Sequence, residues 1–317
     1  MADSCDKYLK KRAELDRWRL VSGSLDEITQ VIVIPVLAED AFLFHTLESL
    51  GANPAAELER TLIVCVVNNR RPPLSPPEDI EENHRALELL DAAIHGRPPS
   101  QNTSLGTQGL RLAYVDASSP GLELPEKDGV GLARKIGMDW AISIFGRSRR
   151  TGKRTKSVVP VLISLDADTL VEPNYLPAIR SHFDETGAWA AVISYAHQTS
   201  GTESERAAIL CYELFLRYHT LGLHYAGSPY AFHTIGSAIA CTADAYVAAS
   251  GMNRRQAGED FYFLQQLEKT GTVGQITDTT VHPSARASTR TPFGTGRRVS
   301  SFPRQGGEAQ MAYHPES

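Results

Sequence analysis

The chain has 317 residues, of which 42% are hydrophobic and 22% are charged, so it can bury a large core and is not an intrinsically disordered sequence. Its 32 basic and 37 acidic residues give a formal net charge of −5, which argues against a protein that mainly neutralises nucleic-acid phosphates. No stretch approaches about 18 uninterrupted apolar residues, and the N-terminus lacks the pattern of a secretory signal. These features predict a soluble, cytoplasmic protein with no transmembrane segment and no nucleic-acid partner.

The first 28 residues are expected to form an N-terminal helical extension on the outside of the molecule. Leu9, Leu15 and Trp18 are spaced among many charged residues, as in an amphipathic helix. The rest of the chain is expected to divide into one main domain and a C-terminal loop and tail, residues 29–280 and 281–317.

Short apolar runs alternate with helical patterns through the main domain. The runs are rich in β-branched residues, which is typical of strands buried on both faces. The predicted strands cover residues 31–35, 62–67, 112–115, 158–165 and 190–195. The predicted helices cover residues 39–50, 79–94, 130–144, 203–223 and 259–269. This alternation predicts an α/β fold with a mostly parallel central sheet flanked by helices.

The long helix predicted at 203–223 has an unusually apolar sequence. Leu210, Leu214 and Leu221 recur at helical spacing, which suits either a core helix or a helix lying on a membrane surface. The charged residues in the helix form no continuous basic face. Packing against the core is therefore the expectation.

The strongest chemical signal is the pair of carboxylates Asp166 and Asp168, which directly follows a predicted buried strand. Side chains at the carboxyl end of a parallel strand enter the crevice where open α/β sheets bind ligands. Two oxygen donors at that place suit a divalent cation that bridges phosphates. The structural alternative is a helix N-cap, in which Asp168 or Thr169 only satisfies free amides.

A second acidic pair, Glu259 and Asp260, opens a predicted amphipathic helix. Acidic side chains in a first helical turn are stabilised by the helix dipole, which is the structural explanation for the pair. In the functional explanation one carboxylate faces a cleft and accepts a proton from an attacking hydroxyl.

Five short motifs in this order resemble the GT-A glycosyltransferases of family 2. The resemblance covers roughly residues 30 to 270 and rests on Val33-Ile34-Pro35-x-x-x-Glu39, Val66-Val67-Asn68-Asn69, Gly131-Leu132-Ala133-Arg134-Lys135, Asp166-Ala167-Asp168 and Gly258-Glu259-Asp260. It implies the GT-A fold and the transfer of a sugar from a nucleotide-diphosphate sugar to an acceptor hydroxyl.

The resemblance also implies where the nucleotide lies. Pro35 and Glu39 match positions beside the nucleotide, and Arg134 matches a position close to the donor. Asn69 stands where the family has an aspartate that contacts the base, so the base preference is left open. A UDP-sugar is the expected donor, with a GDP-sugar as the second candidate, and the acceptor is not identified.

The acidic motifs acquire specific roles through the same resemblance. Asp166 and Asp168 match the site of the metal, Mn²⁺ or Mg²⁺, and of the donor diphosphate. Asp260, with Glu259 beside it, matches the catalytic base of inverting members. A retaining glycosyltransferase and a non-catalytic nucleotide-sugar binding protein are the alternatives. A nucleotidyltransferase is disfavoured because residues 36–40 contain no glycine for a phosphate loop.

The C-terminal segment is expected to complete the donor site. His282 lies where many GT-A enzymes have a third metal contact, although a lone histidine is often structural. The arginines after it, including Arg286, Arg290 and Arg297, match phosphate oxygens in charge and geometry. Residues 281–317 are therefore predicted to form a donor-site loop followed by a tail.

Overall fold

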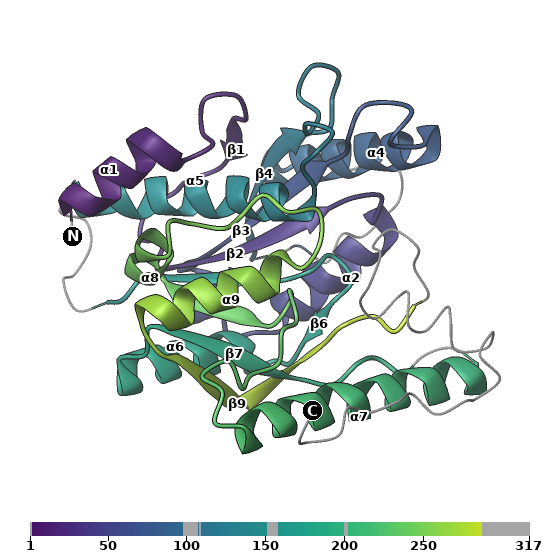
Figure 1. Ribbon diagram of the computed structural model, residues 1–317. Helices are drawn as coiled ribbons and strands as arrows, with labels where there is room; N and C mark the ends of the chain where they lie inside the picture. Colours follow the sequence, from purple (N-terminus) through teal and green to yellow (C-terminus); the bar gives the residue numbers. More distant parts are fainter. Residues whose placement is uncertain (1, 98–106, 108, 151–157, 200–201, 287–317) are drawn as a thin grey trace.

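The computed structural model describes residues 2–97, 107, 109–150, 158–199 and 202–286. Within them, one nine-stranded sheet runs through the molecule, with helices packed on both of its faces (Figure 1). The α/β fold with flanking helices expected from the sequence is confirmed.

Four strands at the centre of the sheet are parallel, and antiparallel pairs flank them on both sides. Its strands lie in the order β1 (Leu20–Ser22), β4 (Arg111–Ala117), β3 (Thr61–Asn68), β2 (Gln30–Val36), β5 (Val161–Ser164), β8 (Ile239–Thr242), β7 (Ala190–Tyr195), β9 (Val273–His282) and β6 (Leu170–Val171). β4, β3, β2 and β5 are parallel, whereas β8 is antiparallel to both β5 and β7. The parallel block brings the carboxyl ends of β2, β3 and β5 to one edge.

Two buried clusters hold the helices against the two faces of the sheet. All of β3 is buried, and so is β2 apart from the partly exposed Pro35, as their continuous apolar sequences require. One cluster joins the sheet to α1 (Ala2–Arg12), α5 (Val130–Arg150), α8 (Ala243–Ala248) and α9 (Glu259–Thr270). The other joins it to α2 (Asp40–Gly51), α3 (Ala55–Leu58), α4 (Pro77–Ile94) and α6 (Tyr175–Thr186).

Helix α5 lies unusually close to the sheet and to the loop before α9. A Cβ built on Gly137 would lie 2.4 Å from Val33 Cγ1, and one on Gly131 would lie 2.6 Å from the Arg255 carbonyl oxygen. Neither position has room for a side chain. These two contacts place the face of α5 that carries Arg134 against the ends of the central strands.

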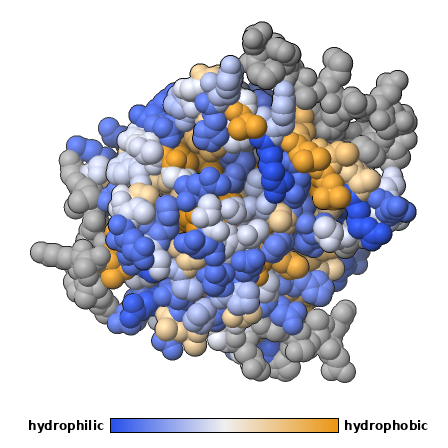
Figure 2. Space-filling view, turned by 90° about the horizontal axis from the view of Figure 1, so that it is seen from below, coloured by the Kyte–Doolittle hydropathy of each residue, from blue (hydrophilic) through white to orange (hydrophobic). Residues whose placement is uncertain are grey.

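The long helix α7 (Glu203–Tyr225) forms as expected, but the prediction that it packs into the core is wrong. Leu210, Leu214 and Leu221 are 55%, 68% and 64% exposed, and the buried residues of the helix are Ala208 and Ile209. Seen from below, where α7 crosses the molecule, hydrophobic residues lie among hydrophilic ones (Figure 2). Periodicity identified the apolar stripe but could not tell whether another element covers it. No helix in the described part of the chain is both long and apolar enough to cross a membrane.

A buried polar network attaches the N-terminal helix to α5. Asp139, which is fully buried, accepts hydrogen bonds from Tyr8 Oη at 2.6 Å, Tyr246 Oη at 2.8 Å and Lys135 Nζ at 2.9 Å. Burial and the Asp139 charge raise the pKa of both tyrosines, which keeps their hydroxyls protonated as donors. The extension is therefore an integral layer of the fold.

This network predicts a large stability effect for Asp139→Leu. The substitution leaves the Lys135 ammonium buried without its carboxylate, which should cost about 3–5 kcal/mol of unfolding free energy in urea titrations. Adding Lys135→Met should restore part of that loss, since an apolar pair replaces the ion pair. Glu81→Gln, at an exposed position, is the control. A double variant no more stable than Asp139→Leu would contradict this account.

Candidate active site

Asp166 and Asp168 lie just beyond the carboxyl end of β5, as predicted. The turn that carries them is fixed from both sides: Leu165 N–H donates to Val33 O at 3.1 Å, and Thr46 Oγ1 donates to Ala167 O at 2.8 Å. The two carboxylate side chains are 35% and 22% exposed. They are thus held rigidly at the edge of the sheet while remaining open to a ligand.

Arg134 connects this strand end to the second acidic pair. Its guanidinium donates to Ser164 Oγ at 2.6 Å, to Asp166 Oδ1 at 2.6 Å and to Glu259 Oε1 at 3.1 Å. The Arg134 side chain is only 4% exposed. Gly236 permits this arrangement, because a Cβ there would lie 2.5 Å from Arg134 Nη2. The predicted donor residue therefore occupies the centre of the acidic cluster.

Glu259 and Asp260 form the first turn of α9 behind Arg134. The helix begins after Gly258, whose φ of 69° is in the left-handed region that favours glycine. Burial raises the pKa of Glu259 despite its ion pair with Arg134. Burial and the neighbouring Glu259 charge raise the pKa of Asp260 to about 7. Asp260 thus exchanges its proton near neutrality, as a general base requires.

Glu39 and Asp168 face a common cation, Arg286. The Arg286 guanidinium is paired with the Glu39 carboxylate and lies 3.1 Å from Asp168 Oδ2. It also lies over the Phe42 ring, 4.4 Å from the centroid. Burial and the Asp166 charge raise the pKa of Asp168, and Arg286 opposes that shift. Arg286 thus brings Glu39 close to Asp168, although the two residues are far apart in sequence.

His282 approaches the same strand end from β9. It is registered opposite Leu170, and its Nδ1–H donates to Ala196 O at 2.9 Å. Its Nε2 lies 3.7 Å from Glu172 Oε1. Gln198 Nε2 donates to Asp168 O at 2.9 Å and to His282 O at 2.8 Å. In the described part of the chain, however, no three His, Cys, Asp or Glu side chains are grouped closely enough to hold a metal ion. The third metal contact stays a prediction.

The side chains at the strand end nevertheless fit the predicted cation. Among the described contacts, Arg134 engages Oδ1 of Asp166 and Arg286 engages Oδ2 of Asp168. The second oxygen of each carboxylate remains for a ligand. Mg²⁺ is commonly bound by one or two carboxylates together with water and substrate phosphates, so two aspartates suffice as the protein's share.

Asn69 has a different environment from the one its motif suggested. It is 2% exposed, and its Nδ2 donates to Arg70 O and Ser118 O while its Oδ1 accepts from Asn83 Nδ2. These bonds connect the ends of β3 and β4 to α4. The contact of Asn69 with a base stays a prediction.

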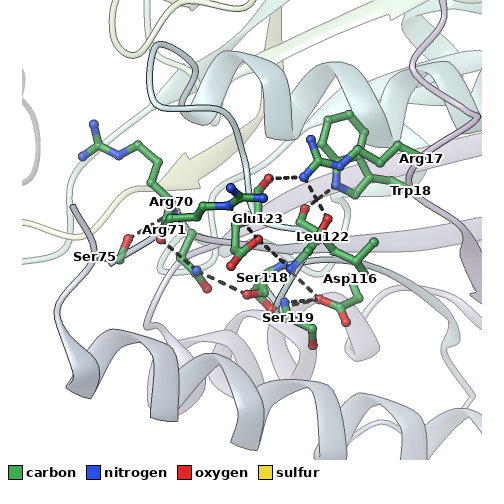
Figure 3. Close-up of polar contacts among 12 residues, drawn as sticks. Arg17, Trp18, Arg70, Arg71, Ser75, Asp116, Ser118, Ser119, Leu122 and Glu123 are labelled. Atoms are coloured by element: carbon green, nitrogen blue, oxygen red, sulfur yellow. Dashed lines mark hydrogen bonds and ion pairs between the residues drawn. The ribbon is translucent and has the colours of Figure 1, made fainter. Parts of the chain in front are cut away.

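The loop after β4 is fixed by a separate polar network (Figure 3). Asp116 accepts from the backbone N–H groups of Ser118 and Ser119, both at 2.9 Å, and these bonds lower its pKa against the effect of burial. Trp18 Nε1 donates to Leu122 O at 2.6 Å, so the N-terminal extension supports this edge. Sequence reasoning named Trp18 only as part of an amphipathic pattern and did not name the Asp116 turn, because short polar turns carry no periodic signal.

Two arginines thus link the predicted acidic residues: Arg134 pairs with Asp166 and Glu259, and Arg286 pairs with Glu39 and Asp168. Asp260 follows Glu259 and interacts with its charge. Ser164 and Gln198 are additional residues of this region that sequence reasoning missed, since isolated serine and glutamine residues match no motif. Arg290 and Arg297 lie outside the described residues.

No protein-family model and no curated protein sequence matches the chain. Among solved structures, S. aureus TarS 1-349 in complex with UDP-GlcNAc is similar over 83% of this chain and 60% of that chain, with a TM-score of 0.50 and 10% identity. M. tuberculosis glucosyl-3-phosphoglycerate synthase is similar over 96% of this chain and 81% of that chain, with a TM-score of 0.41 and 12% identity. The chain therefore spans about three fifths of TarS 1-349. The TarS likeness confirms the predicted GT-A fold.

The raised pKa of Asp260 predicts a pH-dependent stability difference. The pKa is about 7 in the folded protein, above the value of about 3.9 in an unfolded chain, so the folded state loses stability as the pH rises from about 4 through 7. Asp260→Asn removes this loss of stability at high pH, because the asparagine side chain does not ionise. The unfolding free energy of the variant relative to wild type should therefore increase between about pH 5 and pH 8.

Urea titrations at both pH values measure this difference, and Glu88→Gln, at an exposed position on α4, is the matched control. A difference between Asp260→Asn and wild type that does not change with pH would show that Asp260 ionises in the folded protein as it does in the unfolded chain.

Proposed function

We propose that this chain is an inverting, family 2-like glycosyltransferase that moves a sugar from a nucleotide-diphosphate sugar to an acceptor hydroxyl, with a divalent metal at the donor. The observation that carries the proposal is the buried Arg134 bridge, which joins the carboxylates at the end of β5 to the acidic start of α9. This geometry supports a site in which donor binding and proton removal take place on opposite sides of one guanidinium.

The donor side is assigned to the residues at the ends of β2 and β5. Asp166 and Asp168 would hold Mn²⁺ or Mg²⁺, with His282 as the further candidate ligand. When bound, such a cation neutralises charge on the departing diphosphate. Pro35 and Glu39 lie at the end of the neighbouring strand, where we place the nucleoside. The first donor to examine is a UDP-sugar, because the similar TarS structure is described as a complex with UDP-GlcNAc.

The acceptor side is assigned to Asp260. With a pKa of about 7, its carboxylate is substantially ionised at neutral pH and is basic enough to take a hydroxyl proton as attack begins. The acceptor oxygen forms a bond to the anomeric carbon while the bond to the diphosphate oxygen breaks. The acceptor proton goes to Asp260, and the electron pair of the broken bond leaves on the nucleoside diphosphate. A single displacement of this kind inverts the anomeric centre.

Asp260→Asn should separate donor binding from chemistry. The variant should bind UDP-GlcNAc nearly as well as wild type. It should transfer sugar at least about 10²-fold more slowly, since it has no base. In wild type the transfer rate should rise with pH through about 7 and then level off. Titration calorimetry and a transfer assay measure the two quantities. Equal losses of stability and activity would support a helix-capping role instead.

Replacing Asp166 and Asp168 together by asparagine should abolish metal-dependent donor binding. The amides keep the shape of the side chains but lose the charge that holds a hard divalent cation. Calorimetry with UDP-GlcNAc, with and without MnCl₂, should show the metal effect in wild type and its absence in the variant. Circular dichroism checks that the fold is intact. Undiminished transfer by the double variant would overturn the metal assignment.

A further inference from the structure

A cation of the protein already lies at the proposed metal site. Arg286 follows the end of β9 and directs its guanidinium to Glu39 and Asp168, which come from the loops after β2 and β5. The three side chains are 31%, 11% and 22% exposed, with the guanidinium the most exposed of them. Arg286 thus lies at the mouth of the site, over two more deeply buried carboxylates.

This arrangement has an electrostatic reason. Glu39 and Asp168 are held close together by adjoining parallel strands in partly dehydrated surroundings, where like charges repel strongly. A guanidinium can donate to both carboxylates at once through its planar set of N–H groups. The Phe42 ring beneath it adds a cation–π contact. Arg286 therefore neutralises charge that would otherwise destabilise the empty donor site.

The side chain can leave this position without disturbing the fold. Ala285, the residue before it, packs on Ala208 and Ile209 of α7, and Gln198 N–H donates to Pro283 O at 2.9 Å. The backbone is thus anchored up to the residue that carries the guanidinium. Rotation about the long Arg286 side chain is sufficient to release Asp168.

We propose that Arg286 is the internal counter-cation of the donor site: a divalent metal displaces it from Asp168, and the released guanidinium then binds the donor diphosphate. This inference rests on the proposed function and names the residue that couples metal to donor. Without nucleotide, metal must compete with Arg286 and binds weakly. With nucleotide, the diphosphate accepts the guanidinium, so metal and nucleotide each strengthen the binding of the other.

The test compares Mn²⁺ affinity in wild type and Arg286→Gln, measured without nucleotide by the electron paramagnetic resonance signal of free Mn²⁺. The variant should bind Mn²⁺ roughly tenfold more tightly. The enhancement of Mn²⁺ affinity by UDP should shrink by a similar factor. Arg286→Lys should stay close to wild type in the nucleotide-free titration, since the ammonium still opposes the metal.

Arg254→Gln is the matched control. Arg254 also bridges two carboxylates, lying 2.8 Å from Glu14 Oε1 and 2.6 Å from Asp128 Oδ2, but in contacts that involve none of the donor-site residues. Its replacement should leave Mn²⁺ affinity unchanged. Circular dichroism confirms that each variant is folded.

Two outcomes would overturn the inference: Mn²⁺ affinity that is unchanged or weaker in Arg286→Gln, and the absence of Mn²⁺ binding in both proteins. Failure of the proposed function has a different signature. In that case wild type and variant would show the predicted shift in Mn²⁺ affinity, but wild type would transfer no sugar from any nucleotide sugar.

Discussion

The buried guanidinium of Arg134 is the constraint on which the arrangement of the site depends. An arginine stays charged at any physiological pH, so its burial is tolerated only where acceptors and opposite charges surround it. Asp166 and Glu259 supply the charges and Ser164 supplies a further acceptor. Ser164 and Asp166 come from the end of β5 and the turn directly after it, and Glu259 comes from α9. Satisfying the hydrogen bonds of one side chain therefore fixes α9 relative to the end of β5.

This requirement explains features that lie outside the site. Helix α5 must approach the sheet closely for Arg134 to reach the strand end, and Gly137 and Gly131 remove the side chains that would prevent this approach. Gly236 leaves the space that the guanidinium fills. Lys135, the next residue, lies about 100° further round the helix and joins the network around Asp139 that attaches α1. The same helix thus holds the site on one side and the N-terminal extension on the other.

The sequence predicted those parts of the structure that depend on local pattern. β2 and β3 were recognisable because strands buried on both faces are apolar without interruption, and Asp166 and Asp168 stood out because they end such a strand. Contacts between distant segments have no local signal. The ion pair between Arg286 and Glu39 joins residues 247 positions apart. The buried Asn69 amide oxygen accepts a hydrogen bond from Asn83, which lies in a helix inserted between β3 and β4. The exposed apolar face of α7 is a further example. Sequence periodicity identifies the apolar face of a helix but does not show whether another element packs against it.

The balance of charge at the site bears on how a diphosphate can bind there. Five carboxylates, those of Glu39, Asp166, Asp168, Glu259 and Asp260, meet only two of the described arginines, Arg134 and Arg286. Protonation of Asp260, with its pKa of about 7, relieves only part of this excess. An anionic diphosphate approaching the uncompensated carboxylates would be repelled, and a low local dielectric makes that repulsion stronger. On the charges of the described residues alone, a bound diphosphate would therefore need additional positive charge. In the proposed arrangement a divalent cation would supply this charge at Asp166 and Asp168. By displacing Arg286 it would also free a guanidinium, now paired with carboxylates, to bind phosphate.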